Sequence, residues 1–470
     1  MKTGDQIIQE LPWRWRVHGT IALIAALGLL FDGWNVVLAG YVIPLLGPDF
    51  GLTAVQLGLF GASGLAGMAV GAFAWGTVAD VIGRRRVFML TVLVYGFASL
   101  ACALSPTFGI LLVFRFIEGT GLGGCLPVDY SLVSEFTPKK VRGRVLAMLG
   151  IAFPLGATLC GLASTLMLPL ADWRIMLGLM VIPAVLAVWI RRGIPESPLY
   201  LLRRGREAEA REIIDGLVRK TGAPVQEWAA PRLGDDSRLS PMVFVRRLGD
   251  VWSFNWKTTL TVWWLFIAVF FLYYGVLNWM PSILVEEGFG REAAFLRTTF
   301  MTGAGIVSVF LAAWLVEVLG RKSGVLVGGL GSVLGIVLFA VLLDFGTQAV
   351  IWLGIYGFSV QLLIATLYVY VPEIYPTLLR GTGFGWASAI SRIAASAAPI
   401  LLGSVLWPVL GLVGAFGVTA GAVVVALVLT MIFGPETKGR ALAEGDSDAE
   451  LAPGDLAVAP RAAVRPDPAL

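Results

Sequence analysis

The sequence WGTVADVIGRRR at residues 75–86 recurs in altered form as AWLVEVLGRK at residues 313–322. Two further pairs of blocks repeat at a similar distance: EFTPKKVRGR at 135–144 with EIYPTLLRGT at 373–382, and PESP at 195–198 with PETK at 435–438. The offsets are 237, 238 and 240 residues, read from Asp80 to Glu317, Glu135 to Glu373 and Pro195 to Pro435. Three blocks at nearly one offset indicate that the chain consists of two parallel halves, each with the same charged loops.

The composition is that of a membrane protein. Of the 470 residues, 57% are hydrophobic and 14% are charged, whereas about a quarter of a soluble protein is charged. The mean hydropathy is +0.82, and about 20 apolar residues are enough for a helix to cross a bilayer. Twelve apolar spans are expected at about 17–46, 53–79, 86–104, 107–131, 143–168, 173–191, 257–282, 295–319, 323–343, 347–371, 382–407 and 411–433.

Together with the repeat, these spans predict an all-α membrane protein with twelve transmembrane helices in two pseudo-symmetric six-helix bundles. Such an architecture suits alternating access, in which two similar bundles rock about a site near the midplane. The expected parts are an N-terminal segment (1–16), a first bundle (17–191), a central loop with an amphipathic helix (192–256), a second bundle (257–434) and a disordered tail (435–470).

The charged residues predict an orientation. Lys and Arg gather in the central loop and in the loops after the second, fourth, eighth and tenth spans, whereas the opposite loops carry mainly Asp and Glu. By the positive-inside rule, both termini and the central loop are cytoplasmic, in a multi-pass protein of the cytoplasmic membrane. This rule also accounts for the net charge of +4, so nucleic acid is not an expected partner.

Few residues are available for metal or redox chemistry. The three cysteines lie in apolar runs, and the chain has one histidine. We therefore expect no metal site and no cofactor, and any proton carrier should be a carboxylate. The sequence also lacks a nucleotide-binding loop and a nucleophile–histidine pair, so an enzyme is not predicted.

Together with RFIEGTGLGG at 115–124 and PETKG at 435–439, the repeated blocks resemble the signature motifs of the major facilitator superfamily. The resemblance covers residues 17 to 440. LPVDYSLVSEFTPKKVRGR (126–144) and YVPEIYPTLLRGTGFG (370–385) are most similar to a narrower group. This group holds niacin-type and aromatic-acid/proton symporters, synaptic-vesicle-glycoprotein-like proteins and organic-ion carriers, and sugar porters are close relatives.

The charged loops predict a conformational latch. Gly76 is expected to let two helices approach closely, and Asp80 can pair with a nearby arginine or with a helix N-terminus. Such a latch would hold the cytoplasmic side closed in one conformation; the alternative is a simple positive-inside anchor. The expected latch residues are Gly76, Asp80, Gly83, Arg84, Arg85, Glu135, Arg142, Glu317, Arg321, Glu373 and Arg380.

Span four carries Arg115 and Glu118. Their i, i+3 spacing puts them on one helix face, so they can pair. Charged residues at such depth normally face a cavity or a partner. The resemblance associates this motif with proton coupling, and the alternative is a structural pair between packed helices.

Asp32 lies in the first span, within LFDGWNVVLAG (30–40). Gly28, Asp32, Asn35 and Ala39 share one helix face, and a carboxylate there must face a cavity. The niacin-type and aromatic-acid symporters have an FDxxD-like pattern here, so Asn35 replaces their second acid. We expect Asp32 to carry the coupled proton with Arg115 and Glu118; the alternative is a structural pairing of Asp32.

The second half has its own intramembrane charge, Arg392, about halfway along span eleven. A guanidinium group can hold a substrate carboxylate bidentately. The alternative is that Arg392 pairs with Glu373 or with a backbone carbonyl. Further expected substrate-binding residues are Trp34, Asn35, Tyr273, Tyr274, Asn278 and Gln361.

These features predict a secondary active transporter that moves a small organic anion, such as nicotinate or a benzoate, by proton symport. The expected partners are this substrate, protons and the lipid bilayer, with the protein acting as a monomer. The alternatives are a sugar or polyol porter and an exporter of organic cations or drugs.

Overall fold

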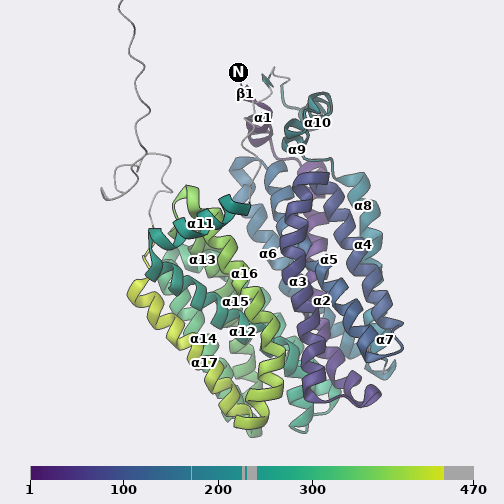
Figure 1. Ribbon diagram of the computed structural model, residues 1–470, viewed down its shortest axis with the longest axis vertical. Coiled ribbons are helices and arrows are strands. Elements are labelled where there is room, and N and C mark those ends of the chain that lie inside the picture. The colour runs from purple at the N-terminus through teal and green to yellow at the C-terminus, as the bar shows by residue number, and fades with distance from the viewer. Residues whose placement is uncertain (1, 171, 225–227, 230–240, 439–470) are drawn as a thin grey trace, which may run out of the picture.

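The computed structural model describes residues 2–170, 172–224, 228–229 and 241–438 (Figure 1). In these residues nearly all regular structure is helical, as predicted. Two short strands, β1 (Lys2–Thr3) and β2 (Trp228–Ala229), pair in parallel. From residue 439 onward, the tail that was expected to be disordered lies outside the described residues.

The first half is built from five long helices and a broken sixth segment. The π-helical turn η1 (Trp15–Gly19) leads into this half. The long helices are α2 (Thr20–Phe50), α3 (Ala54–Ile82), α4 (Arg84–Ala103), α5 (Phe108–Phe136) and α6 (Lys139–Met167). After η2 (Leu168–Leu170), the sixth segment consists of α7 (Trp173–Gly178), η3 (Leu179–Val185) and α8 (Leu186–Gly193).

The second half repeats this order. Its helices are α12 (Trp256–Glu286), α13 (Arg291–Leu319), α14 (Arg321–Val341), α15 (Thr347–Ile374), α16 (Thr377–Leu401) and α17 (Trp407–Phe433). The short turns η4 (Leu343–Phe345) and η5 (Leu402–Leu406) precede α15 and α17.

The described residues contain 10 helical segments that are long and apolar enough to cross a membrane, compared with twelve predicted spans. Predicted spans eleven and twelve lie within one segment of 55 residues, Leu379–Phe433, because the helical path continues through η5. Predicted span six, 173–191, is missing from the ten because a 3₁₀ stretch with Pro183 inside it divides this segment into shorter helices. Apolar composition alone does not reveal either feature.

One end of the molecule, here called the charged end, carries the N-terminus and the central stretch (Figure 1). Its helices are α1 (Gly4–Glu10), α9 (Pro198–Arg203), α10 (Glu207–Thr221) and α11 (Pro241–Phe254). Helix α10 is amphipathic, as predicted: it buries Ala210, Ile214 and Leu217. It lies against α1, which buries Ile7 and Ile8.

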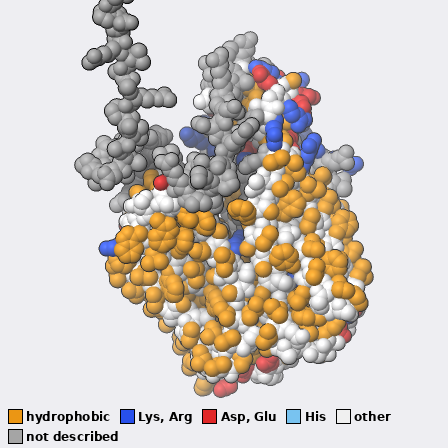
Figure 2. Space-filling view, in the orientation of Figure 1, with side chains coloured by type: hydrophobic (Ala, Val, Ile, Leu, Met, Phe, Trp, Pro, Cys, Tyr) orange, Lys and Arg blue, Asp and Glu red, His pale blue; other side chains and the backbone are white. Residues whose placement is uncertain are grey.

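The flanks of the molecule are apolar. In Figure 2 hydrophobic side chains cover the surface between the two ends, and most of the visible Lys and Arg gather at the charged end. The charged side chains visible at the opposite end are mainly Asp and Glu. An apolar band between two polar ends is the surface that a bilayer requires.

The two halves pack against each other toward the end opposite the charged end. The Tyr41 hydroxyl of α2 lies 3.0 Å from the Thr299 hydroxyl of α13, and Thr158 of α6 donates to Thr302 of α13 at 3.4 Å. Gly58 of α3 lies against the backbone of α16, since a Cβ there would be 2.9 Å from the Pro399 carbonyl oxygen. The two halves are therefore in contact at this end.

Glycines allow the helices within each half to approach closely. A Cβ at Gly156 of α6 would overlap the carbonyl oxygen of Leu30 in α2, and one at Gly71 of α3 would overlap that of Thr120 in α5. Gly76, which we expected to mark a close helix contact, does not: a Cβ there would meet no atom of the described residues within 4 Å. It lies at an open place on α3, so that expectation was wrong.

This difference between the two glycines can be tested. Gly156→Ala should lower the free energy of unfolding by about 1–3 kcal/mol, because two backbones must move apart. Gly76→Ala should leave it unchanged or raise it by up to about 1 kcal/mol, because alanine is the better helix former. Thermal unfolding of the purified variants in detergent measures both. Equal losses in the two variants would contradict the packing described here.

Candidate functional site

The loop between α3 and α4 depends on Gly83, whose φ of 100° is unfavourable for other residues. The Glu196 carboxylate fills the space beside it and accepts a hydrogen bond from the backbone N–H of Arg85 at 3.1 Å. Free N–H groups at a helix N-terminus favour a carboxylate there. Arg84, the first residue of α4, forms an ion pair with Glu135 of α5. These contacts join α4 to α5 and to the segment after α8.

The second half repeats this arrangement at Gly320, whose φ is 94°. Glu436 accepts hydrogen bonds from the backbone N–H groups of Arg321 at 3.1 Å and Lys322 at 3.2 Å. Burial raises the pKa of Glu436, but bonds from four backbone N–H groups outweigh this and hold its pKa below the ordinary value. The Arg321 side chain pairs with Glu373 at 3.0 Å.

The two capping carboxylates, Glu196 and Glu436, were not among the predicted site residues. The available signal was the repeated PESP and PETK, in which each glutamate follows the proline. The repeat alone does not show that both glutamates cap a helix, because that requires knowing where the chain passes α4 and α14.

Two of the remaining predicted latch residues bind backbone carbonyl groups. Arg142 donates to a backbone carbonyl at 3.2 Å and Arg380 to another at 2.9 Å. Glu317 is exposed, and the side chain of Asp80 lies outside the part described. The ion pairs Arg84–Glu135 and Arg321–Glu373 each lie within one half of the molecule.

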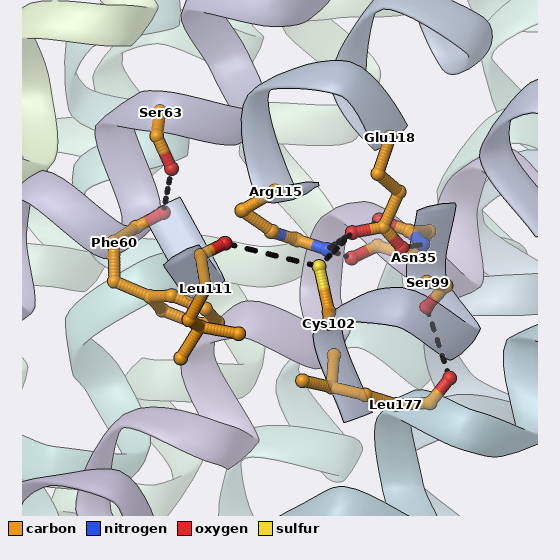
Figure 3. Close-up of polar contacts among 9 residues, drawn as sticks. All are labelled: Asn35, Phe60, Ser63, Ser99, Cys102, Leu111, Arg115, Glu118 and Leu177. Atoms are coloured by element: carbon orange, nitrogen blue, oxygen red, sulfur yellow. Dashed lines mark hydrogen bonds and ion pairs between the residues drawn. The ribbon is translucent and has the colours of Figure 1, made fainter. Parts of the chain in front are cut away.

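Arg115 and Glu118 form the buried ion pair that their spacing predicted, with the guanidinium Nη1 and the carboxylate Oε2 2.6 Å apart (Figure 3). Asn35 of α2 binds both partners: its amide oxygen accepts from Arg115 at 2.9 Å, and its amide nitrogen donates to Glu118. The Cys102 thiol lies 3.8 Å from the same carboxylate, and the guanidinium lies over the Phe60 ring. Asn35 thus fixes this pair.

A small cavity of about 10 Å³ joins this cluster to the second half, which is about the room that one water molecule needs. Its lining includes Arg115, Asn35 and Asn278, the last from α12. Two buried polar atoms of this lining, Arg115 Nε and Asn278 Oδ1, have no hydrogen-bond partner among the described residues. The absence of side chains at Gly61 and Gly64 leaves room for them, since Cβ atoms there would lie 2.7 Å from Asn278 Oδ1 and 3.0 Å from Arg115 Nε.

Asp32 and Arg392 bring an acidic and a basic side chain from the two halves into one region. Asp32 of α2 is 2% exposed, and Arg392 of α16 is half-buried. Arg392 acts electrostatically on Asp32 and on Tyr274 and Tyr368, and it donates to the Tyr274 hydroxyl at a long 3.3 Å. The Oδ1 atom of Asp32 has no hydrogen-bond partner among the described residues.

The alternative partner for Arg392, Glu373, is engaged elsewhere. Its carboxylate binds Arg321 at 3.0 and 3.1 Å and accepts from the Thr437 hydroxyl at 2.6 Å. The guanidinium of Arg392 therefore faces the region of Asp32 with one weak neutral hydrogen bond among its described contacts.

The structure adds a second carboxylate that we had not singled out, Asp129 of α5. It is 0% exposed, and both of its carboxyl oxygens lack a hydrogen-bond partner in the part described. A Cβ on Gly28 would lie 2.9 Å from its Oδ2 atom, so Asp129 reaches α2 one helical turn before Asp32. The signal in the sequence was the acid in LPVDYS.

The other predicted substrate-binding residues are spread over several helices. Tyr273 is buried, with its ring 5.3 Å from that of Tyr274. Trp34 is half-buried. Gln361 of α15 packs within the second half, where a Cβ on Gly305 would be 2.7 Å from it.

Two comparisons with known proteins concern the sequence. The family model described as the Major Facilitator Superfamily matches residues 25–399. The niacin transporter NiaP of Acinetobacter baylyi is 34% identical over 438 residues, which cover 93% of this chain and 98% of that protein. The benzoate transport protein of the same species is 25% identical, with 84% of each chain covered.

A third comparison concerns the fold. A partially occluded, inward-open structure of the xylose transporter XylE from E. coli superimposes with a TM-score of 0.70, at 20% identity, and covers 90% of this chain and 99% of that one. The family match and the NiaP relationship extend over most of the sequence, and the fold agrees with both. The chain belongs to the major facilitator superfamily of transporters, and it is not an enzyme.

Proposed function

We propose that this transporter moves a small organic anion, an aromatic carboxylate of the nicotinate or benzoate kind, together with a proton. The observation that carries the proposal is Arg392, which faces the Asp32 region with one long hydrogen bond, to Tyr274, among its described contacts. The sequence relatives named as niacin and benzoate transporters support the same class of substrate.

The charge on Arg392 is the basis of anion binding. Arginine stays protonated at any working pH, and its planar fork can hold a carboxylate through two parallel hydrogen bonds. In this proposal Asp32, on which Arg392 acts electrostatically, supplies the opposing charge in the substrate-free protein. Beside Arg392, the rings of Tyr274 and Tyr368 offer apolar faces against which a flat ring can pack.

Proton coupling follows from competition for Arg392. When the substrate carboxylate binds the guanidinium, Asp32 loses its compensating charge. A buried carboxylate without a cation is costly, so Asp32 takes up a proton. When the substrate leaves, Arg392 again stabilises the ionised form of Asp32, and the proton is released. One proton thus accompanies one anion.

The Arg115–Glu118 pair supports coupling in a different way. It lies beside the cavity that joins α5 to Asn278 of the second half, where the two halves meet. We propose that the Arg115–Glu118 pair responds to closure of the end opposite the charged end. Asn35 then holds the pair in place rather than contacting the substrate.

The charged end is assigned to the cytoplasm by the positive-inside rule, which places both termini there in a cytoplasmic membrane. The inter-half contacts at the opposite end then close the outer side, so the structure corresponds to an inward-facing state. In the latch, the ion pairs Arg84–Glu135 and Arg321–Glu373 keep each half rigid as it rocks. The protein is proposed to act as a monomer.

Arg392 provides the test of substrate charge. Arg392→Lys keeps the charge but loses the planar fork, so the affinity for benzoate should fall about tenfold. Arg392→Ala should lower it more than about hundredfold, because the bound carboxylate loses its partner. Thermal stabilisation and uptake should be compared for benzoate and its neutral amide, benzamide, with Arg174→Ala at the opposite end as the control arginine variant.

Wild-type protein that binds benzoate and benzamide equally well would refute the organic-anion proposal. Normal benzoate binding by Arg392→Ala would do the same. Either result would favour the sugar or polyol alternative, which the likeness to a xylose transporter supports at the level of fold alone.

Asp32 provides the test of coupling. Asp32→Asn mimics the protonated form permanently, so substrate exchange across proteoliposomes should remain while accumulation driven by a pH gradient disappears. The measurement is radiolabelled benzoate uptake with and without the gradient. Normal gradient-driven accumulation by Asp32→Asn would remove Asp32 from the coupling mechanism.

A further inference from the structure

Asp129 lies in the interior of the first half, and no compensating partner for it is found among the described residues. Its side chain is completely buried, and neither carboxyl oxygen receives a hydrogen bond from the described residues. Its Oδ2 atom is directed toward Gly28, one turn from Asp32 on α2. A buried carboxylate in this position is unusual, because buried ionised groups are normally paired.

Among the described residues, the groups that face Asp129 come from several helices and are neutral or acidic. Asp32 of α2 and Tyr95 of α4 interact with it electrostatically, as do Cys125 and Tyr130 of α5 itself. The cation of the region, Arg392, acts on Asp32 and not on Asp129 in the part of the chain described. Within the described part of the chain, Asp32 therefore has a counter-charge and Asp129 has none.

Two carboxylates this close in a dry environment do not both remain ionised. The carboxyl group that faces the cation keeps its charge, and the one without a cation takes the proton. We propose that Asp129 holds a proton as a neutral carboxylic acid in the substrate-free transporter, so that Asp32 supplies the single negative charge opposite Arg392.

This inference deepens the proposed function, and its consequence for the substrate rests on that function. With Asp129 neutral, Asp32 and Arg392 balance, and protonation of Asp32 leaves one net positive charge to attract an anion. With Asp129 ionised, the same region would carry a net negative charge, which would repel an anion and suit an organic cation. The proton on Asp129 thus makes the region selective for anions.

Infrared spectroscopy of the substrate-free protein tests the location of the proton directly. A protonated carboxyl group has a C=O stretching band that is distinct from those of a carboxylate and that shifts in D₂O. At neutral pH we expect the wild-type spectrum to contain this band, Asp129→Asn to lose it, and Asp32→Asn to retain it. Asp49→Asn, at an exposed carboxylate of the opposite end, is the matched control and should leave this region of the spectrum unchanged.

Three results would overturn the proposal: no protonated carboxyl band in the wild type, an unchanged band in Asp129→Asn, or loss of the band in Asp32→Asn. The last measurement does not require the Asp129 variant to fold. Because no substrate is present, the outcome is independent of the proposed function. Failure of wild-type protein to bind benzoate would refute that function and leave the infrared result standing.

Discussion

Arg392 carries a permanent positive charge, because arginine is not deprotonated in proteins. This charge lies between the two halves of a membrane protein, and the need for a negative charge opposite it constrains the rest of the site. In the described structure the acidic residue that acts on it electrostatically is Asp32, which belongs to the other half, and we propose that Asp32 supplies the opposing charge. Electrostatic interactions are strong where water is excluded, so this pair connects the two halves through its charge. In the proposed mechanism a substrate carboxylate competes with Asp32 for the same guanidinium, which ties substrate binding to the charge of Asp32. Under this proposal, alternating access and proton coupling share one interaction.

Coupling of this kind requires rigid halves, because a local change of charge at Asp32 must move whole helical bundles. Within each half, glycines bring helix backbones into direct contact, as Gly156 does against Leu30. At the charged end, Glu196 and Glu436 cap equivalent helices in the two halves, and equivalent arginine–glutamate pairs join neighbouring helices. These contacts lie within the halves, whereas the contacts between halves lie toward the opposite end. The contacts that hold each bundle together are thus separate from the contacts that join the two bundles.

Much of this architecture was predictable from the sequence, because hydropathy and the repeated loops depend on short segments. The predicted pairing of Arg115 with Glu118 is also local, since both lie on one turn of α5. Predicted span six is not a continuous helix, because a 3₁₀ stretch interrupts it. The sequence did not reveal this interruption, because a 3₁₀ stretch leaves no mark in hydropathy. Asp129 was overlooked because it stood near the expected end of a span at residue 131, whereas α5 runs to Phe136 and places it in the interior. The partners of Asn35 depend on the packing of α2 against α5, which a single sequence does not specify.

A double-mutant cycle on Asp32 and Arg392 tests the link between the halves most directly. Asp32→Asn, Arg392→Gln and the combined variant would be compared by thermal unfolding of the substrate-free protein. Each single variant should be destabilised, because it leaves one charge uncompensated, and the combined variant should recover part of the loss. The account predicts a coupling energy of at least about 1 kcal/mol between the two positions. Effects that add within about 0.5 kcal/mol would show that the two residues do not interact, and would contradict the account.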